Sequence, residues 1–446
     1  MMPSPSASRP SLASDCNLLE HMNTKRIVTS LLLLLLILSM MAAGSAEESA
    51  EFVDYASQLH LNMNSATLKT TATVKSFVDG DTVHFYVPTS ISATGYVKVR
   101  FLALNTPEST GKIEEYGVKA SNFTREKLEN AVSIILEADS TEMEIDSTGE
   151  RYLFWVWYQP AEGEEYRNLN VELLQNGLAK AYSTFNTQYG SICSNALDQA
   201  RQFKLNMYSG EADPDYYYGD AIEITLKELR CHAEKYLNKK VAFNGIVTLT
   251  YSQSAYVEAY DADSDIVYGI SVYYGYSLSG KGLSILTPGN EVRVVGTVQY
   301  YEAANQYQVS DVSYRQMKPS DPNNLQLISD GQLPYYTETS LDRLLNDTVT
   351  IVDEENGAET YNYAELAQYT SVSVDGLKVT AASSTGSVVY LTCVCGDQQI
   401  TVEAPYSEEM LTLIDHTINV RGFVERDYDG NVIICTYLQD AITLQD

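Results

Sequence analysis

The chain has 446 residues and carries 29 Lys and Arg against 59 Asp and Glu, which gives a formal net charge of −30. This length allows two to four domains, and a hydrophobic fraction of 44% with 20% charged residues is that of an ordinary soluble globular protein. The charge excludes binding of nucleic acid by bulk attraction, because phosphates are repelled on approach. Any such contact needs a local site that recruits a cation.

The N-terminal segment is typical of an export signal. Two basic residues, Lys25 and Arg26, precede an uncharged apolar run that ends in small residues at Ala46. This order predicts a signal peptide region, 1–46, that is cleaved after Ala46, with Met22 as an alternative true start. The mature protein is then secreted, or associated with the cell surface, without a membrane span. An uncleaved anchor is the alternative, because the apolar run is long enough to cross a bilayer.

The next segment, 47–70, is polar and weakly patterned, which predicts a linker. Periodic β-rich runs follow at 71–78 and 82–87, and the Asp-Gly-Asp sequence at 79–81 between them has the turn chemistry of a hairpin. A further alternating strand is predicted at 97–103.

Helical spacing appears at 116–131 and again at 169–178, and a last helix is predicted over 194–205. A strand pair around 152–157 separates the first two helices. Together these elements predict a small β-barrel with helices packed on it, in a domain of residues 71–210.

The tail, which we define as residues 211–446, has a different composition. It holds 13 basic and 35 acidic side chains, whereas residues 71–210 hold 12 and 18. The acid excess therefore lies mostly in the tail. The chain has 34 tyrosines, which can stack on bases. Because the tail shows no basic strip interleaved with aromatic residues, we expect its tyrosines to pack the barrels and their surfaces instead.

The tail also repeats itself. The segment 291–298 is echoed by 417–424, with β-rich runs before and after each copy and a glycine in the middle of each. A mid-strand glycine fits a sharply coiled barrel strand, as in OB-folds. We therefore predict two smaller OB-like modules, joined by a linker near 319–345. The predicted fold class is mainly β with helices (α+β), and the two modules are expected at 222–318 and 346–446.

Four clusters in 71–210 carry the polar side chains of interest. They are Val78-Asp79-Gly80-Asp81-Thr82, the run from Val99 to Glu108, Glu115-Tyr116-Gly117, and Gly149-Glu150-Arg151-Tyr152. In this order and spacing they resemble the staphylococcal nuclease (thermonuclease) family, over nearly all of the domain. The resemblance implies an OB-fold barrel and a Ca²⁺-dependent endonuclease of the micrococcal type. Such an enzyme cuts single-stranded or frayed DNA and RNA and releases 3′-phosphates.

The residues themselves suit hydrolysis of a phosphodiester, which needs a cation, a positioned water and help for the developing charge. Asp81 leaves a tight turn and Asn105 ends a strand, so both offer oxygen atoms from rigid β elements. Calcium prefers such oxygen ligands, and the main-chain carbonyl of Thr106 can complete the protein's share. Glu108 lies three residues beyond Asn105 and can orient or deprotonate the water.

Two arginines, Arg100 and Arg151, can each offer a forked pair of donors to phosphate oxygens. Five extended residues from Arg100 to Asn105 span roughly 16 Å, so the site closes only if the strand coils and the arginine reaches back. The resemblance assigns calcium to Asp81, Asn105 and Thr106. It makes Glu108 the general base, gives phosphate and transition-state binding to both arginines, and leaves Tyr116 as a further substrate-binding candidate.

Two departures from the family pattern leave alternatives open. Asn105 stands where the family's best-known member has an aspartate, and Glu150 separates Gly149 from Arg151, although the family usually places them side by side. Asn105 could then simply cap the turn, and Arg167 could compete for the role of Arg151. The alternative function is a nucleic-acid or surface binding protein with a decayed nuclease site.

Overall fold

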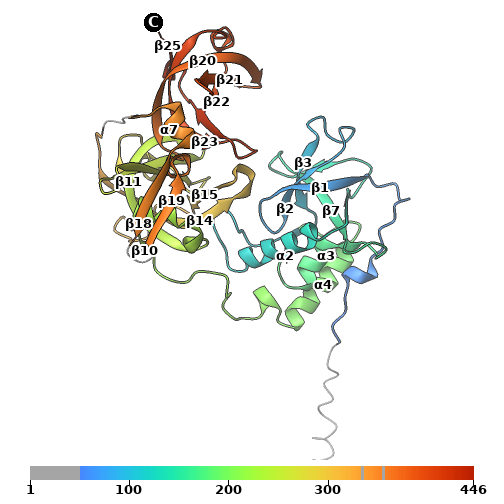
Figure 1. Ribbon diagram of the computed structural model, residues 1–446. Coiled ribbons are helices and arrows are strands. Elements are labelled where there is room, and N and C mark those ends of the chain that lie inside the picture. Colours follow the sequence, from blue (N-terminus) through green and yellow to red (C-terminus); the bar gives the residue numbers. More distant parts are fainter. Residues whose placement is uncertain (1–50, 333–335, 354–356, 446) are drawn as a thin grey trace, which may run out of the picture. The chain divides into compact units, whose positions relative to one another are not determined.

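The computed structural model describes residues 51–332, 336–353 and 357–445 (Figure 1). The predicted signal region, 1–46, lies outside these residues, so its cleavage stays a prediction. The elements below all belong to one compact unit that begins at Asp54. None of the described helices combines the length and apolar character needed to cross a bilayer.

The first domain is a closed barrel of five strands. They are β1 (Lys69–Phe77), β2 (Thr82–Tyr86), β3 (Tyr96–Phe101), β5 (Ser133–Glu137) and β7 (Tyr152–Gln159). Each strand pairs with two neighbours in the order β1-β2-β3-β7-β5, and β5 returns to β1. The pairing of β3 with β7 is parallel and the others are antiparallel. The hairpin predicted around residues 79–81 is therefore present as β1 and β2.

Three helices cover the barrel of the first domain: α2 (Gly117–Glu129), α3 (Leu169–Gln175) and α4 (Gly190–Gln202). Figure 1 shows them gathered beside the strands. The short strands β4 (Leu104–Asn105), β6 (Glu144–Ile145), β8 (Arg167–Asn168) and β9 (Lys180–Ala181) complete the domain. Alternation in β3 explains the packing, because Val97, Val99 and Phe101 are buried while Lys98 and Arg100 keep access to solvent. The core strand β3 thus presents Arg100 at the barrel surface.

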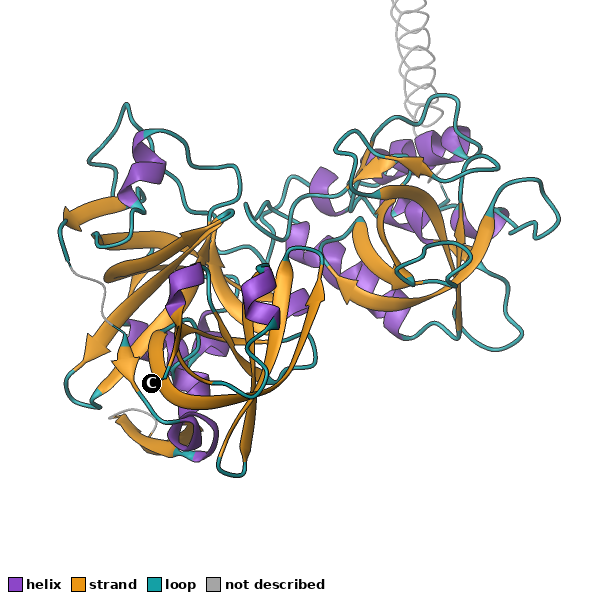
Figure 2. Cartoon of the chain, turned by 90° about the horizontal axis from the view of Figure 1, so that it is seen from above, coloured by secondary structure: helices purple, strands orange, loops and turns teal. Residues whose placement is uncertain are grey.

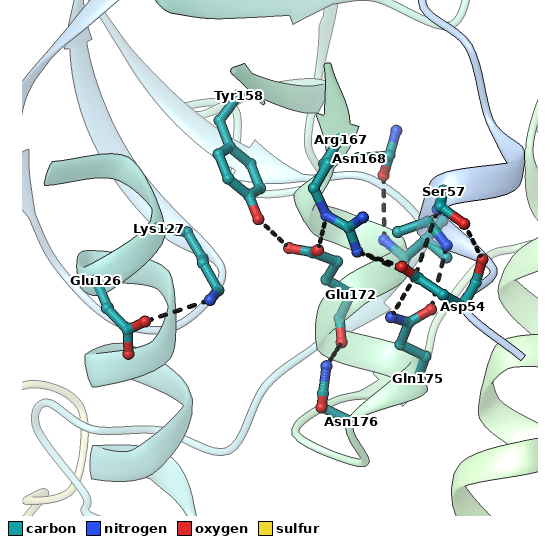
Figure 3. Close-up of polar contacts among 12 residues, drawn as sticks. Asp54, Ser57, Glu126, Lys127, Tyr158, Arg167, Asn168, Glu172, Gln175 and Asn176 are labelled. Atoms are coloured by element: carbon teal, nitrogen blue, oxygen red, sulfur yellow. Dashed lines mark hydrogen bonds and ion pairs between the residues drawn. The ribbon is translucent and has the colours of Figure 1, made fainter. Parts of the chain in front are cut away.

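Arg167 belongs to a structural network of the first domain (Figure 3). Its guanidinium donates to both carboxylate oxygens of Asp54, at 2.8 and 3.0 Å, and to Glu172. The hydroxyl of Tyr158 donates to the same Glu172 at 2.7 Å. Arg167 therefore fixes α3 and does not take the place of Arg151. The network also binds the chain before β1, expected to be a linker, and Ala56 in this segment is fully buried.

Two further closed barrels form the tail, and both repeat the strand order of the first. Figure 2 draws the strands in orange and the helices in purple. The second barrel contains β11 (Lys240–Tyr251), β12 (Ser254–Asp261), β13 (Ile266–Tyr273), β14 (Glu291–Tyr301) and β15 (Gln306–Ser310). The third contains β20 (Ser371–Thr385), β21 (Val388–Cys395), β22 (Gln398–Pro405), β23 (Thr417–Arg426) and β24 (Val432–Cys435). In each barrel the third and fifth strands pair in parallel. The predicted fold class, with three OB-like barrels, is confirmed.

The glycines of the echoed segments allow the last two strands of each tail barrel to approach closely. A Cβ atom at Gly296 of β14 would lie 2.5 Å from the carbonyl oxygen of Ser310. At Gly422 of β23 it would lie 2.7 Å from the carbonyl oxygen of Cys435. Neither distance is compatible with a side chain, so the repeated glycine marks the same packing constraint in both barrels.

Each tail repeat begins with a short strand and a capped helix. In the second barrel these are β10 (Ile222–Glu223) and α5 (Leu226–Cys231), and in the third they are β17 (Thr337–Glu338) and α7 (Leu341–Asn346). The hydroxyls of Thr225 and Ser340 cap the two helices in the same way. The third repeat thus starts near residue 337, inside the segment expected to be a linker, rather than at 346.

The remaining α-helices and β-strands of the tail lie outside the two sets of barrel strands. They are α6 (Lys281–Ile285), β16 (Gln326–Ser329), β18 (Thr348–Asp353), β19 (Gly357–Asn362), α8 (Tyr363–Leu366), α9 (Glu408–Leu411) and β25 (Ile442–Leu444). The two tail barrels share one hydrophobic core. At their junction the buried carboxylate of Glu258 accepts hydrogen bonds from Thr248 and from the backbone and side chain of Ser371. The tail is therefore a single packed body.

Candidate active site

The turn between β1 and β2 is held rigidly against two other segments. The backbone N–H of Asp81 donates to Asp79 Oδ1 at 3.0 Å, which closes the turn. A Cβ atom at Gly80 would lie 2.9 Å from side-chain atoms of both Thr106 and Ala120, so only glycine fits this approach. The hydroxyl of Thr124 donates to Gly80 O at 2.7 Å. The turn thus rests on α2 and on the loop after β4.

Asp81 is almost completely buried, with 4% of its surface exposed, and both carboxylate oxygens have hydrogen-bond donors. Thr82 Oγ1 donates to Oδ1 at 2.9 Å, and the backbone N–H of Thr106 donates to Oδ2 at 3.1 Å. Arg100 Nη2 lies 3.9 Å from the same Oδ2. Asp81 therefore connects the hairpin turn, the end of β4 and the arginine of β3.

The chain folds back sharply between β3 and β4, which closes the distance from Arg100 to Asn105. Ala103 has φ +66°, in the left-handed region that non-glycine residues rarely adopt. As a result Arg100 Nη2 donates a hydrogen bond to Asn105 Oδ1, and Asn105 Nδ2 donates to Thr106 O at 3.1 Å. The coiling that the sequence required is present, and it brings Arg100, Asn105, Thr106 and Asp81 together.

The oxygen atoms gathered here match the chemistry of a hard cation. Asp81 offers a carboxylate, Thr106 a main-chain carbonyl and Asn105 an amide oxygen, which are all ligands that calcium accepts. Asn105 Oδ1 already accepts one hydrogen bond from Arg100, which leaves its second lone pair for a cation. Within residues 51–332, 336–353 and 357–445, no group of three or more His, Cys, Asp and Glu side chains forms a metal cluster. The donor set therefore fits calcium through mixed oxygen ligands rather than through carboxylates alone.

Burial and neighbouring carboxylates raise the pKa values of two acidic residues at this site, Asp79 and Glu108. Desolvation, followed by the negative charges of Asp81 and Glu114, raises the pKa of Glu108, while the arginines oppose the change. Burial, together with the charges of Asp81 and Glu108, raises the pKa of Asp79 well above its usual range. Mutual repulsion of this kind creates a negative potential that a cation relieves.

Backbone contacts of Glu108 with Gly117 and Glu114 fix the position of this residue. A Cβ atom at Gly117, the first residue of α2, would lie 2.1 Å from Glu108 O, so the loop packs directly on the helix start. The N–H of Glu114 donates to the same carbonyl at 2.9 Å. Glu108 as a residue is exposed, although its surroundings still desolvate the carboxyl enough to raise its pKa. The expected general base thus stands on a fixed loop that solvent can reach.

Asp146, which the sequence analysis did not single out, holds the side chain of Arg151. The Nε and Nη2 atoms of this arginine lie 2.8 and 2.7 Å from Asp146 Oδ2, and its Nη1 atom donates to Thr82 Oγ1 at 3.4 Å. Since Thr82 in turn donates to Asp81, Arg151 is connected to the same cluster. Arg151 makes these contacts although Glu150 separates it from Gly149.

Asp146 is fixed by the turn that precedes β7. Its Oδ1 atom accepts from the backbone N–H of Thr148 at 3.1 Å and from its hydroxyl at 2.6 Å. Although burial alone raises the pKa of Asp146, the hydrogen bonds from Thr148 and Arg151 lower it to about 2. The signal in the sequence was the run Asp146-Ser147-Thr148-Gly149, which is typical of an Asx-turn.

Two tyrosines near the cluster differ in their surroundings. Tyr116 is buried, and its hydroxyl bonds to Ser209 Oγ at 3.1 Å and to Glu211 O at 3.0 Å. It therefore fastens the end of the domain, and its role in substrate binding stays a prediction. Tyr182, which sequence reasoning did not single out, is 57% exposed and its ring lies 5.7 Å from the guanidinium carbon of Arg100.

A comparison with known protein families bears on this cluster. Residues 98–210 match the sequence model of a family described as staphylococcal nuclease homologue. The matched stretch includes Arg100, Asn105, Glu108 and Arg151, whereas the turn with Asp81 precedes it. The match and the closed barrel confirm the resemblance noted in the sequence. Residues 98–210 of the first domain are therefore similar to staphylococcal nuclease homologues, and this similarity indicates a general function of the nuclease type, the binding or hydrolysis of nucleic acid.

Proposed function

We propose that this protein is a secreted, calcium-dependent phosphodiesterase that hydrolyses single-stranded or frayed DNA and RNA and leaves 3′-phosphates. The observation that carries the proposal is the convergence of Arg100, Asn105, Thr106 and Asp81 through direct hydrogen bonds and a charge contact. The signal pattern that ends at Ala46 supports secretion.

Asp81, Asn105 and the carbonyl of Thr106 would hold the calcium ion. When bound, the ion supplies positive charge that screens the phosphate and favours the charge developing during hydrolysis. The carboxylate of Glu108 accepts the proton of the attacking water, and its raised pKa strengthens it as a base toward water. A chain with net charge −30 needs such a local source of positive charge.

The two arginines orient the phosphate. Arg100 and Arg151 both belong to the cluster around Asp81, so their free donors are available for phosphate oxygens on the same side of the barrel. Guanidinium groups bind such oxygens in pairs, and donors aimed at developing charge stabilise the transition state most. Asp146 contacts two nitrogen atoms of Arg151. The guanidinium of Arg151 is therefore oriented before substrate binds.

The direct test is digestion of heat-denatured DNA by the full-length mature protein with calcium and with excess chelator. We expect cleavage only with calcium, because the oxygen ligands act through the ion. Cleavage that ignores the chelator would remove the metal mechanism. Binding of the strand without cleavage, even at high calcium, would instead support the decayed nuclease site.

Substitution of Asn105 by aspartate tests its assignment as a ligand. The change Asn105→Asp adds a negative charge to the site, so the calcium concentration for half-maximal rate should fall, by about tenfold. Arg100 now donates a hydrogen bond to the amide oxygen of Asn105, and it would form an ion pair with an aspartate at that position. The measurement is the rate of DNA hydrolysis against calcium for both proteins. Asn64→Asp, at an exposed position, is the control for added charge. If the two calcium titrations coincide, Asn105 is not a ligand.

Removal of Asp146 tests the positioning of Arg151. The variant Asp146→Ala frees the guanidinium, so kcat should fall by roughly 10- to 100-fold with little change in KM. A double-mutant cycle with Arg151→Ala separates positioning from general damage to the fold. In the Arg151→Ala background, loss of Asp146 should cost almost nothing further. Equal losses in both backgrounds would show that Asp146 does not act through Arg151.

A further inference from the structure

A cleft of about 610 Å³ brings residues of the second barrel to the side of the nuclease domain that carries Arg151. The tail contributes Tyr251, Ser252, Gln253, Ser254, Tyr256, Ser271, Tyr273, Tyr276, Tyr301, Gln306, Gln308 and Tyr369 to its lining. We call Tyr251, Tyr273, Tyr276 and Tyr301 the tyrosine face. The volume is that of an ordinary ligand site.

Among the described residues, the cleft that contains the tyrosine face, which we call the tyrosine cleft, is not lined by the acidic side chains that dominate the rest of the tail. Although the tail holds 35 acidic side chains, none of the described tail residues that line this cleft carries a charge. The nuclease domain adds Lys98, Arg151 and Glu150 as its charged lining, and Lys98 lies 3.9 Å from Glu150. A phosphate chain entering here therefore meets Arg151 and Lys98, and Glu150, which lies beside Lys98, is the one carboxylate among the described lining residues.

The tyrosine face presents aromatic rings to solvent. Tyr276 is 90% exposed, Tyr251 59% and Tyr301 39%. Beneath them Tyr256 and Tyr369 are buried, with ring centroids 4.9 Å apart, and form an aromatic floor. Contiguous exposed apolar patches mark interaction sites, and unpaired bases stack on exposed aromatic rings.

The tyrosine face also reaches the loop of the expected general base. An adjoining cleft of about 590 Å³ shares Tyr273 and Tyr276 and is lined by Glu108. The buried side chain of Gln299, in β14, secures this loop, because it donates to Ser109 O and accepts from the N–H of Gly111, both at 3.1 Å. The second barrel thus contacts the active-site loop directly.

We propose that the tyrosine face is a binding site for single-stranded nucleic acid, in which unpaired bases stack on Tyr251, Tyr276 and Tyr301 while the phosphates extend to Arg151. This inference rests on the proposed nuclease function and gives it a substrate class. Paired bases hide their faces in a duplex, so the second barrel selects unpaired strands of several nucleotides over both duplexes and single nucleotides.

The first test measures binding without cleavage. Full-length Glu108→Gln protein, in calcium, is titrated into a fluorescently labelled oligothymidylate while anisotropy is recorded. Base stacking accounts for the expected loss, so Tyr276→Ala should weaken binding about fivefold or more, and the triple change of Tyr251, Tyr276 and Tyr301 to alanine about 30-fold or more. Tyr260→Ala, at a 55% exposed tyrosine of the same barrel outside the lining, is the matched control and should bind normally. Unchanged binding by the triple variant overturns the inference.

The second test separates the tyrosine face from the active site. Hydrolysis of a chromogenic thymidine phosphodiester, which has no further bases to stack, is compared with hydrolysis of the oligothymidylate. In the otherwise native chain, the triple variant should keep its rate on the small ester and lose it on the oligonucleotide through a raised KM. Equal losses on both substrates contradict the inference. If neither substrate is cut by the native chain, the proposed nuclease function fails, and the anisotropy titration still decides whether the tyrosines bind strands.

Discussion

The backward turn of the chain at Ala103 is the constraint on which the site depends. A strand that continued straight from Arg100 would place Asn105 roughly 16 Å away. The left-handed conformation of Ala103 instead returns the chain, so Asn105 accepts from Arg100 and the N–H of Thr106 reaches Asp81. Gly80 makes this possible from the other side, because a side chain there would collide with Thr106. Local backbone strain is thus offset by a network of hydrogen bonds around one buried carboxylate.

Electrostatics follow from the same arrangement. Burial, followed by the negative charge of Asp81, raises the pKa values of Asp79 and Glu108, while Arg100 and Arg151 oppose the change at Glu108. In the proposed function, a cation binds beside the carboxylates and a phosphate beside the arginines, although the whole chain carries a net charge of −30. The acidic tail does not contradict this, since the tail residues lining the tyrosine cleft are uncharged.

Much of this could be predicted from the sequence, and the remainder depends on tertiary structure. Alternating strands, the turn at residues 79–81 and the repeated glycines led to three barrels, because these signals are local. The conformation of Ala103 left no trace, since alanine shows no preference for positive φ. The start of the third repeat was missed although Ser340 caps a helix there. The tyrosines were assigned to packing, because only the folded barrel shows that Tyr276 and its neighbours share one face.

The central claim is that a buried aspartate in this fold binds calcium and thereby allows an acidic protein to act on a polyanion. Calorimetric titration of calcium into the full-length protein and into Asp81→Asn measures this without any nucleic acid. Asparagine keeps the shape and can still accept from Thr106, but it removes the charge. The wild type should bind calcium, and the variant should bind it at least about tenfold more weakly. Equal calcium affinity in the two proteins, or no binding by the wild type, would contradict the claim.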